Sequence, residues 1–145
     1  MPPIYVETDN KKEKLYNAHL AGAALASKLE GRIEAMTKKA VDDQAGFTTS
    51  KTEGAKGYFI RFKLTKFEAS GGSTKCVLLG EIERYPKSGT KSGAKGAEMV
   101  NLGKWEGTAE ASGTSEGSAM QCVEAIMEAK LPKAFPAMTA DMKKR

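Results

Sequence analysis

The two cysteines, Cys76 and Cys122, are the residues of this 145-residue sequence whose positions bear most directly on chemistry. Cys76 follows the alternation of Leu78 and Ile82 in a strand-like run, and Cys122 belongs to an apolar stripe with helical period. Both side chains should therefore point into one helix–sheet interface, joined by a disulfide or close enough to join. Two buried free thiols would also satisfy this placement, whereas a disulfide indicates an oxidising compartment. A redox enzyme would need cysteines that are adjacent in sequence or exposed.

Histidine and the carboxylates give little support to catalysis. His19 is the single histidine of the chain, so no second imidazole is present for a zinc site. Glu81 and Glu83 share one face of a predicted strand, where Arg61 and Lys63 can pair with them across strands. We therefore expect no catalytic residue, no metal site and no cofactor.

The run from Gly113 to Gly117 has the Gly-x-Ser-x-Gly spacing of a nucleophile elbow. That elbow needs a parallel sheet and a histidine later in the chain, whereas the predicted sheet is antiparallel and His19 comes first. A helix cap at Thr114 or Ser115 is the better explanation. The glycine-rich runs also lack the Gly-Lys-Ser/Thr ending of a phosphate-binding loop. The sequence accordingly predicts a non-enzymatic protein.

The centre of the predicted sheet is the stretch from Gly57 to Tyr85. Its first half alternates with the period of a half-buried strand. The two alternating series are Tyr58, Ile60, Phe62 and Leu64 on one side, and Phe59, Arg61, Lys63 and Thr65 on the other. A Ser-Gly-Gly-Ser turn leads to a second strand over residues 75–85. A third strand over about 99–111 changes parity at Leu102-Gly103, which predicts a bulge.

Helices are predicted on both sides of these strands. Asn10 and Glu13 form a capping-box pattern, which starts a helix over residues 10–39. Residues 46–51 can form a short edge strand, and a second helix over 115–131 ends before a proline. The predicted fold class is α+β: a two-layer sandwich whose antiparallel meander of three to four strands carries two helices on one face. The order is α-(β)-β-β-β-α.

The predicted domain organisation is a single α+β domain over residues 10–138. We expect a flexible N-terminal segment over 1–9 and a disordered basic tail over 139–145. The sequence has no run of about 18 apolar residues, so we expect no transmembrane helix. Residues 1–4 lack the features of a secretory signal, so either the protein is cytoplasmic or a leader has been removed and replaced by Met1.

Basic residues give the chain a net charge of +5, and several gather in one loop. The loop over residues 86–96 is rich in glycine, serine and lysine, so we expect it to be mobile. Together with one face of the first long strand it forms a candidate interaction surface. The residues of this surface are Phe59, Arg61, Lys63, Lys87, Lys91 and Lys95.

The order of elements, with the run Cys76–Ile82 and the closing run Gly107–Ala111 before an alanine-rich helix, resembles a class of small bacterial envelope proteins. These are the α/β domains of outer-membrane lipoproteins, such as activators of penicillin-binding proteins and the amino-terminal domain of the Tol translocation protein. The resemblance covers about residues 12–131. It implies a non-enzymatic binding or assembly domain, periplasmic or associated with the outer membrane, with a protein partner.

The alternative hypothesis is a cytoplasmic protein associated with nucleic acid or another anionic surface. It would use the lysine-rich loop and the basic strand face. The oligomeric state is open in both cases.

Overall fold

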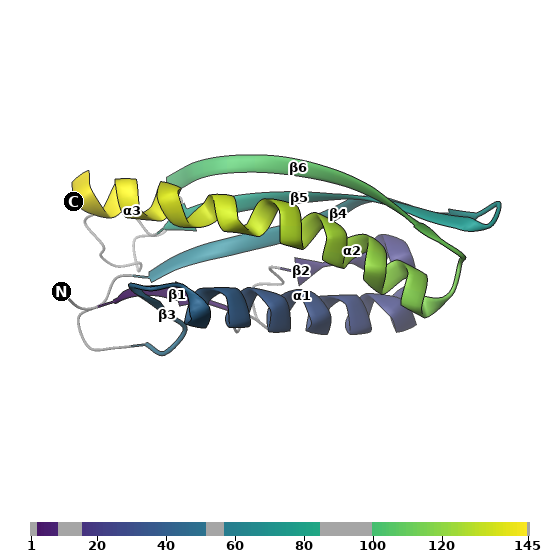
Figure 1. Cartoon of the computed structure of the whole chain (residues 1–145), viewed down its shortest axis with the longest axis horizontal. Helices are drawn as coiled ribbons and strands as arrows, with labels where there is room; N and C mark the ends of the chain where they lie inside the picture. The colour runs from purple at the N-terminus through teal and green to yellow at the C-terminus, as the bar shows by residue number, and fades with distance from the viewer. Residues whose placement is uncertain (1–2, 9–15, 52–56, 85–99, 145) are drawn as a thin grey trace, which may run out of the picture.

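A computed structural model describes residues 3–8, 16–51, 57–84 and 100–144 of the chain; for Tyr16 and Asn17 it describes the backbone. These residues form one mixed sheet with helices packed on one side of it (Figure 1). The strand order is β3-β1-β4-β5-β6, with β2 beside β4. The predicted α+β class is confirmed, although the sheet is not the purely antiparallel meander that the sequence predicted.

Three long antiparallel strands form the main part of the sheet: β4 (Gly57–Ser70), β5 (Ser73–Arg84) and β6 (Val100–Ser112). Gly71 and Gly72 make the β4–β5 turn with φ angles of 63° and 83°, values that favour glycine. Register shifts interrupt β4 between Leu64 and Lys66, and the β5–β6 pairing beside Leu102. The second shift confirms the predicted bulge.

Three short strands extend the edge of β4: β1 (Ile4–Glu7), β2 (Tyr16–Asn17) and β3 (Phe47–Thr48). β1 pairs in parallel with both β3 and the start of β4. The sequence predicted residues 1–9 to be flexible, but Val6 is fully buried. The ring of Tyr5 lies over Gly57, 3.1 Å from where a Cβ atom would stand. Packing and pairing therefore order a segment too short to show periodicity.

The first helix, α1 (Ala23–Asp43), begins later and ends later than predicted. Gly22 precedes it with a φ angle of 92°, a conformation outside the helical region, so the chain changes direction there. His19 lies upstream in a short 3-10 helix, His19–Ala21, and is exposed. The helix end was predicted near Lys39 from charge alone, but Val41 is buried and extends the apolar stripe by another turn. The buried residues of α1 are Ala26, Leu29, Ile33, Thr37 and Val41.

The second helix, α2 (Glu116–Lys130), packs on β5 and β6. Its cap is Ser115, whose hydroxyl accepts a hydrogen bond from the Ser118 amide at 3.2 Å, as the sequence predicted. Two ion pairs join α2 to α1: Lys28–Glu116 at 2.9 Å and Arg32–Glu124 at 2.7 Å. Because the residue numbers rise together in these pairs, the two helices run parallel, as Figure 1 also shows.

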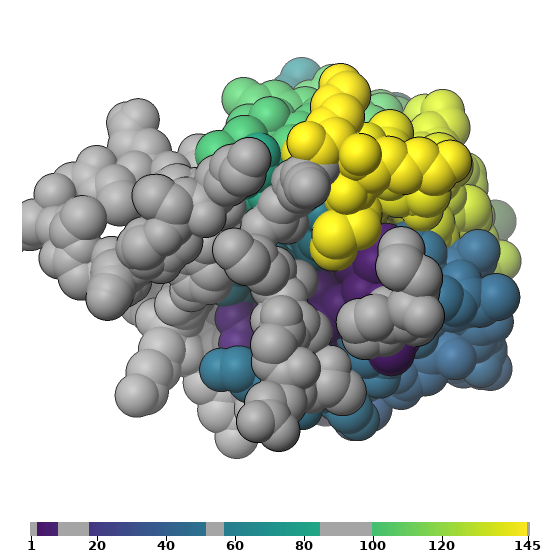
Figure 2. Space-filling view, turned by 90° about the vertical axis from the view of Figure 1, so that its left-hand side faces the viewer, coloured from purple at the N-terminus to yellow at the C-terminus, as the bar shows by residue number. Residues whose placement is uncertain are grey.

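The expected disordered tail is instead a helix, α3 (Ala134–Lys144), which follows a 3-10 turn at Leu131–Lys133. Phe135 contacts Phe47 of β3 edge-on, with ring centroids 4.9 Å apart. Figure 2 shows the C-terminal helix (yellow) beside the N-terminal strand (purple) and α1 (blue). The prediction was wrong because the basic residues at 143–144 occupy the exposed end of a helix whose Met138 is fully buried.

Candidate interaction surface

One face of the long-stranded sheet is covered by helices, and no described helix covers the other (Figure 1). Cys76 bonds to α2, so the residues of β5 that alternate with it point to the uncovered side. Residues paired directly across antiparallel strands share a face, which extends this side to β4 and β6. We call this side the open face.

The open face consists of four rows that cross β4, β5 and β6 in that order. The rows are Arg61–Glu81–Lys104, Lys63–Leu79–Glu106, Lys66–Val77–Thr108 and Glu68–Lys75–Glu110. All twelve side chains are exposed or half-buried. The face is therefore accessible within the described part of the chain.

Charges on the open face are nearly balanced. Five basic residues stand among four acidic ones, and Glu83 at its end supplies a fifth carboxylate. Arg61 Nε forms an ion pair with Glu83 Oε1 at 2.6 Å, without the angle of a hydrogen bond. Asn101 donates a hydrogen bond to Glu81 at 3.1 Å. This mixture of signs suits a partner that itself carries both signs of charge, as protein surfaces do.

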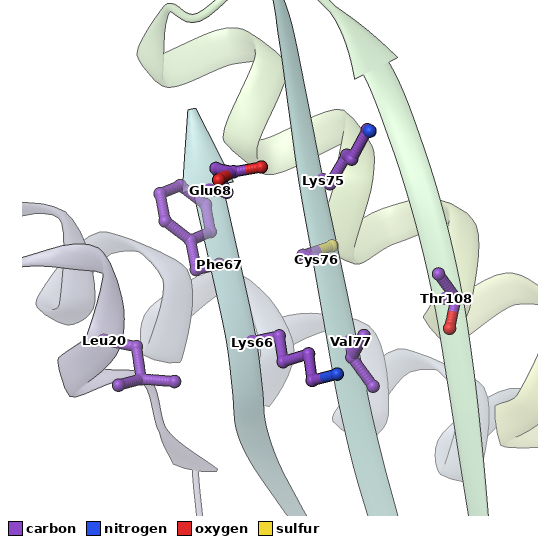
Figure 3. Close-up of a pocket in the computed structure, with 8 residues that line it drawn as sticks. All are labelled: Leu20, Lys66, Phe67, Glu68, Lys75, Cys76, Val77 and Thr108. Carbon is purple, nitrogen blue, oxygen red and sulfur yellow. The ribbon is translucent and has the colours of Figure 1, made fainter. Parts of the chain in front are cut away.

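A hollow lies beside the irregularity in β4, where the third and fourth rows of this face approach Leu20 of the 3-10 helix. Figure 3 shows Lys66, Val77 and Thr108 next to one another on three adjacent strands. The hollow has a volume of about 640 Å³ and is also lined by Leu20, Phe67, Glu68, Lys75 and Cys76. Leu20 is 57% exposed, so apolar side chains are available at its margin. Apolar and charged side chains occur together in protein contact surfaces.

The predicted interaction residues fall into three groups. Lys63 is exposed and Arg61 is half-buried, so both belong to the open face. Phe59 pairs with Glu83 and so lies on the same side of the sheet, but it is only 1% exposed and is not available for contact. The three loop lysines, Lys87, Lys91 and Lys95, lie outside the described residues. The predicted mobility of their loop likewise stays a prediction.

Cys76 and Cys122 are joined as a disulfide between β5 and α2, with Cα atoms 6.3 Å apart. Both are buried, at 1% and 0% exposure. The predicted proximity is therefore confirmed. Cys122 Sγ also lies 3.2 Å from the carbonyl oxygen of Ala109, which would accept a hydrogen bond from the thiol in the reduced protein.

A buried polar cluster that no sequence pattern predicted lies between the sheet and α3. Asp141 Oδ2 accepts hydrogen bonds from the Tyr58 hydroxyl at 2.9 Å and from Arg84 Nε at 2.8 Å. The side chains of Arg84 and Asp141 are 13% and 11% exposed. Asp141 lies 57 residues from Arg84, and no local pattern connects them. The cluster ties α3 to β4 and β5.

No family model, curated protein or solved structure matches this chain. The resemblance to envelope lipoprotein domains therefore stays a prediction. The helices within residues 3–8, 16–51, 57–84 and 100–144 include none with the length and hydrophobicity that a membrane span requires. Within the same residues, no group of three histidine, cysteine or acidic side chains could hold a metal ion.

Proposed function

We propose that this protein is a non-enzymatic binding or assembly domain of the bacterial cell envelope that contacts a protein partner through its open face. The observation that carries the proposal is the one-sided arrangement of the fold. The described helices pack on a single side, so three long strands present their other side to solvent. Sheet faces of this kind bury polar and apolar side chains together when a protein partner covers them.

The disulfide supports the envelope location. Disulfides persist in oxidising compartments such as the periplasm and are rare in the cytosol of mesophiles. Cys76 and Cys122 are close enough to be joined while both are buried in the helix–sheet interface. A structural staple is the role that such a bond performs.

The alternative, binding of nucleic acid, receives less support from the strand face. Affinity for nucleic acid comes mainly from basic groups that neutralise phosphates. Here a carboxylate stands directly beside Arg61, Lys75 and Lys104 in their rows. A polyanion laid across the face would meet Glu81 and Glu110 as well as the lysines, and like charges would oppose it.

Site-specific photo-cross-linking in the cells that make the full-length protein tests this proposal. A photoreactive residue at Thr108 probes the open face, and the same residue at Ser27, exposed on α1, is the matched control. We expect cross-links to protein from position 108 and far fewer from position 27. A nuclease-sensitive product from position 108 would favour the alternative, and equal labelling from both positions would overturn the choice of surface.

A further inference from the structure

The charges of the open face are arranged so that the face is complementary to a second copy of itself with the order of the rows reversed. The outer rows are Arg61–Glu81–Lys104 and Glu68–Lys75–Glu110. Along the three strands the signs read plus, minus, plus in the first row and minus, plus, minus in the second. Each strand therefore carries opposite charges at its two ends of the face.

The inner rows carry the apolar centre. Leu79 and Val77 occupy neighbouring rows on β5, between the charged residues Glu81 and Lys75. A two-fold axis that crosses the strands between Leu79 and Val77 would exchange the inner rows and would also exchange the outer rows. Such an axis makes each residue of one copy face its exchanged counterpart in the other, as in any symmetric dimer.

We propose that the occupant of the open face is a second copy of this chain, in a face-to-face two-fold dimer. In this arrangement Leu79 lies on Val77 of the second copy. Three kinds of opposite-charge contact surround the centre, and each occurs twice because of the symmetry. The contacts are Arg61 with Glu68, Glu81 with Lys75, and Lys104 with Glu110.

One contact in this dimer is unfavourable. Lys63 would face Lys66 of the second copy, since both occupy β4 in the inner rows. Both side chains are exposed at the β4 side of the face, so their ammonium groups can extend into water. The other inner contact, Glu106 with Thr108, is neutral. The charge pattern thus favours this axis at three of four charged contacts.

The size of the face predicts a weak dimer. Twelve residues from each copy is about half of the roughly 20–30 per side in a standard specific interface. Charge pairs at the surface weaken in salt, because ions screen them over about 8–10 Å. We therefore expect dimerisation at low ionic strength and dissociation as salt is added. The inference deepens the proposed function, on which it rests, by naming the partner.

Sedimentation velocity of the purified chain, with its disulfide intact, tests this dimer. Lys75→Glu converts two attractive contacts per dimer into two repulsive ones, and we expect at least a tenfold weaker association. Glu81→Lys should weaken it similarly. The double variant Lys75→Glu/Glu81→Lys restores opposite charges at both contacts, so association should recover. Lys38→Glu, which makes the same charge change at an exposed position of α1, should leave association unchanged.

Folding of each variant is checked by thermal melting. The pair Lys104→Glu and Glu110→Lys on β6 repeats the charge-swap test should the β5 variants not fold. A wild-type chain that stays monomeric at low salt and high concentration would overturn the dimer. So would a Lys75→Glu variant that still associates normally, or a double variant that does not recover. A monomer whose position 108 cross-links to another protein would refute the dimer and leave the proposed function standing.

Discussion

Ile126 of α2 occupies the space that a side chain at Gly107 of β6 would need. Its Cγ2 atom lies 2.5 Å from the position that a Cβ atom would take there, closer than real Cβ contacts. A glycine in a strand often marks such a close approach of another element. The missing side chain lets α2 lie directly on β6, the last strand in the order of the sheet.

Gly107→Ala should destabilise the protein by about 1–3 kcal/mol, because α2 must move away or Ile126 must change rotamer. Gly103→Ala in the same strand is the control, since its Cβ would meet Ile82 Cδ1 at an ordinary 3.9 Å. Chemical denaturation of both variants measures the difference. Equal stability of the two would mean that α2 does not pack this closely.

Asp141→Ala should lower stability by roughly 3 kcal/mol, since it removes the carboxylate of an ion pair whose two side chains are at most 13% exposed. It also removes the acceptor of the Tyr58 hydroxyl. Amide exchange should become faster along α3. The control is Asp43→Ala, which breaks the exposed pair with Lys39 and should change stability far less, because solvent screens that pair. Similar losses from both variants would contradict the buried cluster.

Leu29→Ala should cost about 2–5 kcal/mol, because Leu29 is fully buried between α1 and the sheet. Leu25→Ala should cost less, because Leu25 is only partly buried one turn earlier. Thermal melting ranks the two variants. The reverse order would place a different side of α1 against the sheet.

Reducing the disulfide should lower stability by about 4 kcal/mol in the chain-entropy picture, since the bond closes a loop with a separation of 46 residues. We expect the melting temperature to fall by roughly 10 °C or more. The helical and strand content should persist at room temperature, because the strand pairing and most of the buried core do not depend on the disulfide. Circular dichroism with and without reductant measures both quantities. The variant Cys76→Ala/Cys122→Ala has no disulfide to reduce, so it controls for other effects of the reductant.

Local patterns predicted the parts of this fold that have their own periodicity. The alternation around Ile60 and Leu78, the bulge beside Leu102 and the Ser115 cap all depend on neighbours in sequence. Strand parity and helical period also predicted that Cys76 lies close to Cys122, although the two are separated by 46 residues in sequence.

The remaining parts depend on partners that sequence patterns do not reveal. The N-terminal strand owes its order to parallel pairing with β4, and α3 owes part of its order to Asp141. The start of α1 was misplaced because a capping pattern upstream resembled a helix start, whereas Gly22 has the conformation that precedes the helix. The open face was expected as a partly basic strand surface, but its balance of charge emerges only from the register of three strands.

The redox state of Cys76 and Cys122 inside cells tests the envelope location, on which the proposed function depends, most directly. Cells that make the full-length protein are quenched with acid, denatured with a thiol-alkylating reagent present, and the two cysteines are examined by mass spectrometry without reduction. An oxidising compartment predicts one disulfide-linked peptide pair and no alkylated cysteine. Recovery of both cysteines in alkylated form would contradict the envelope location.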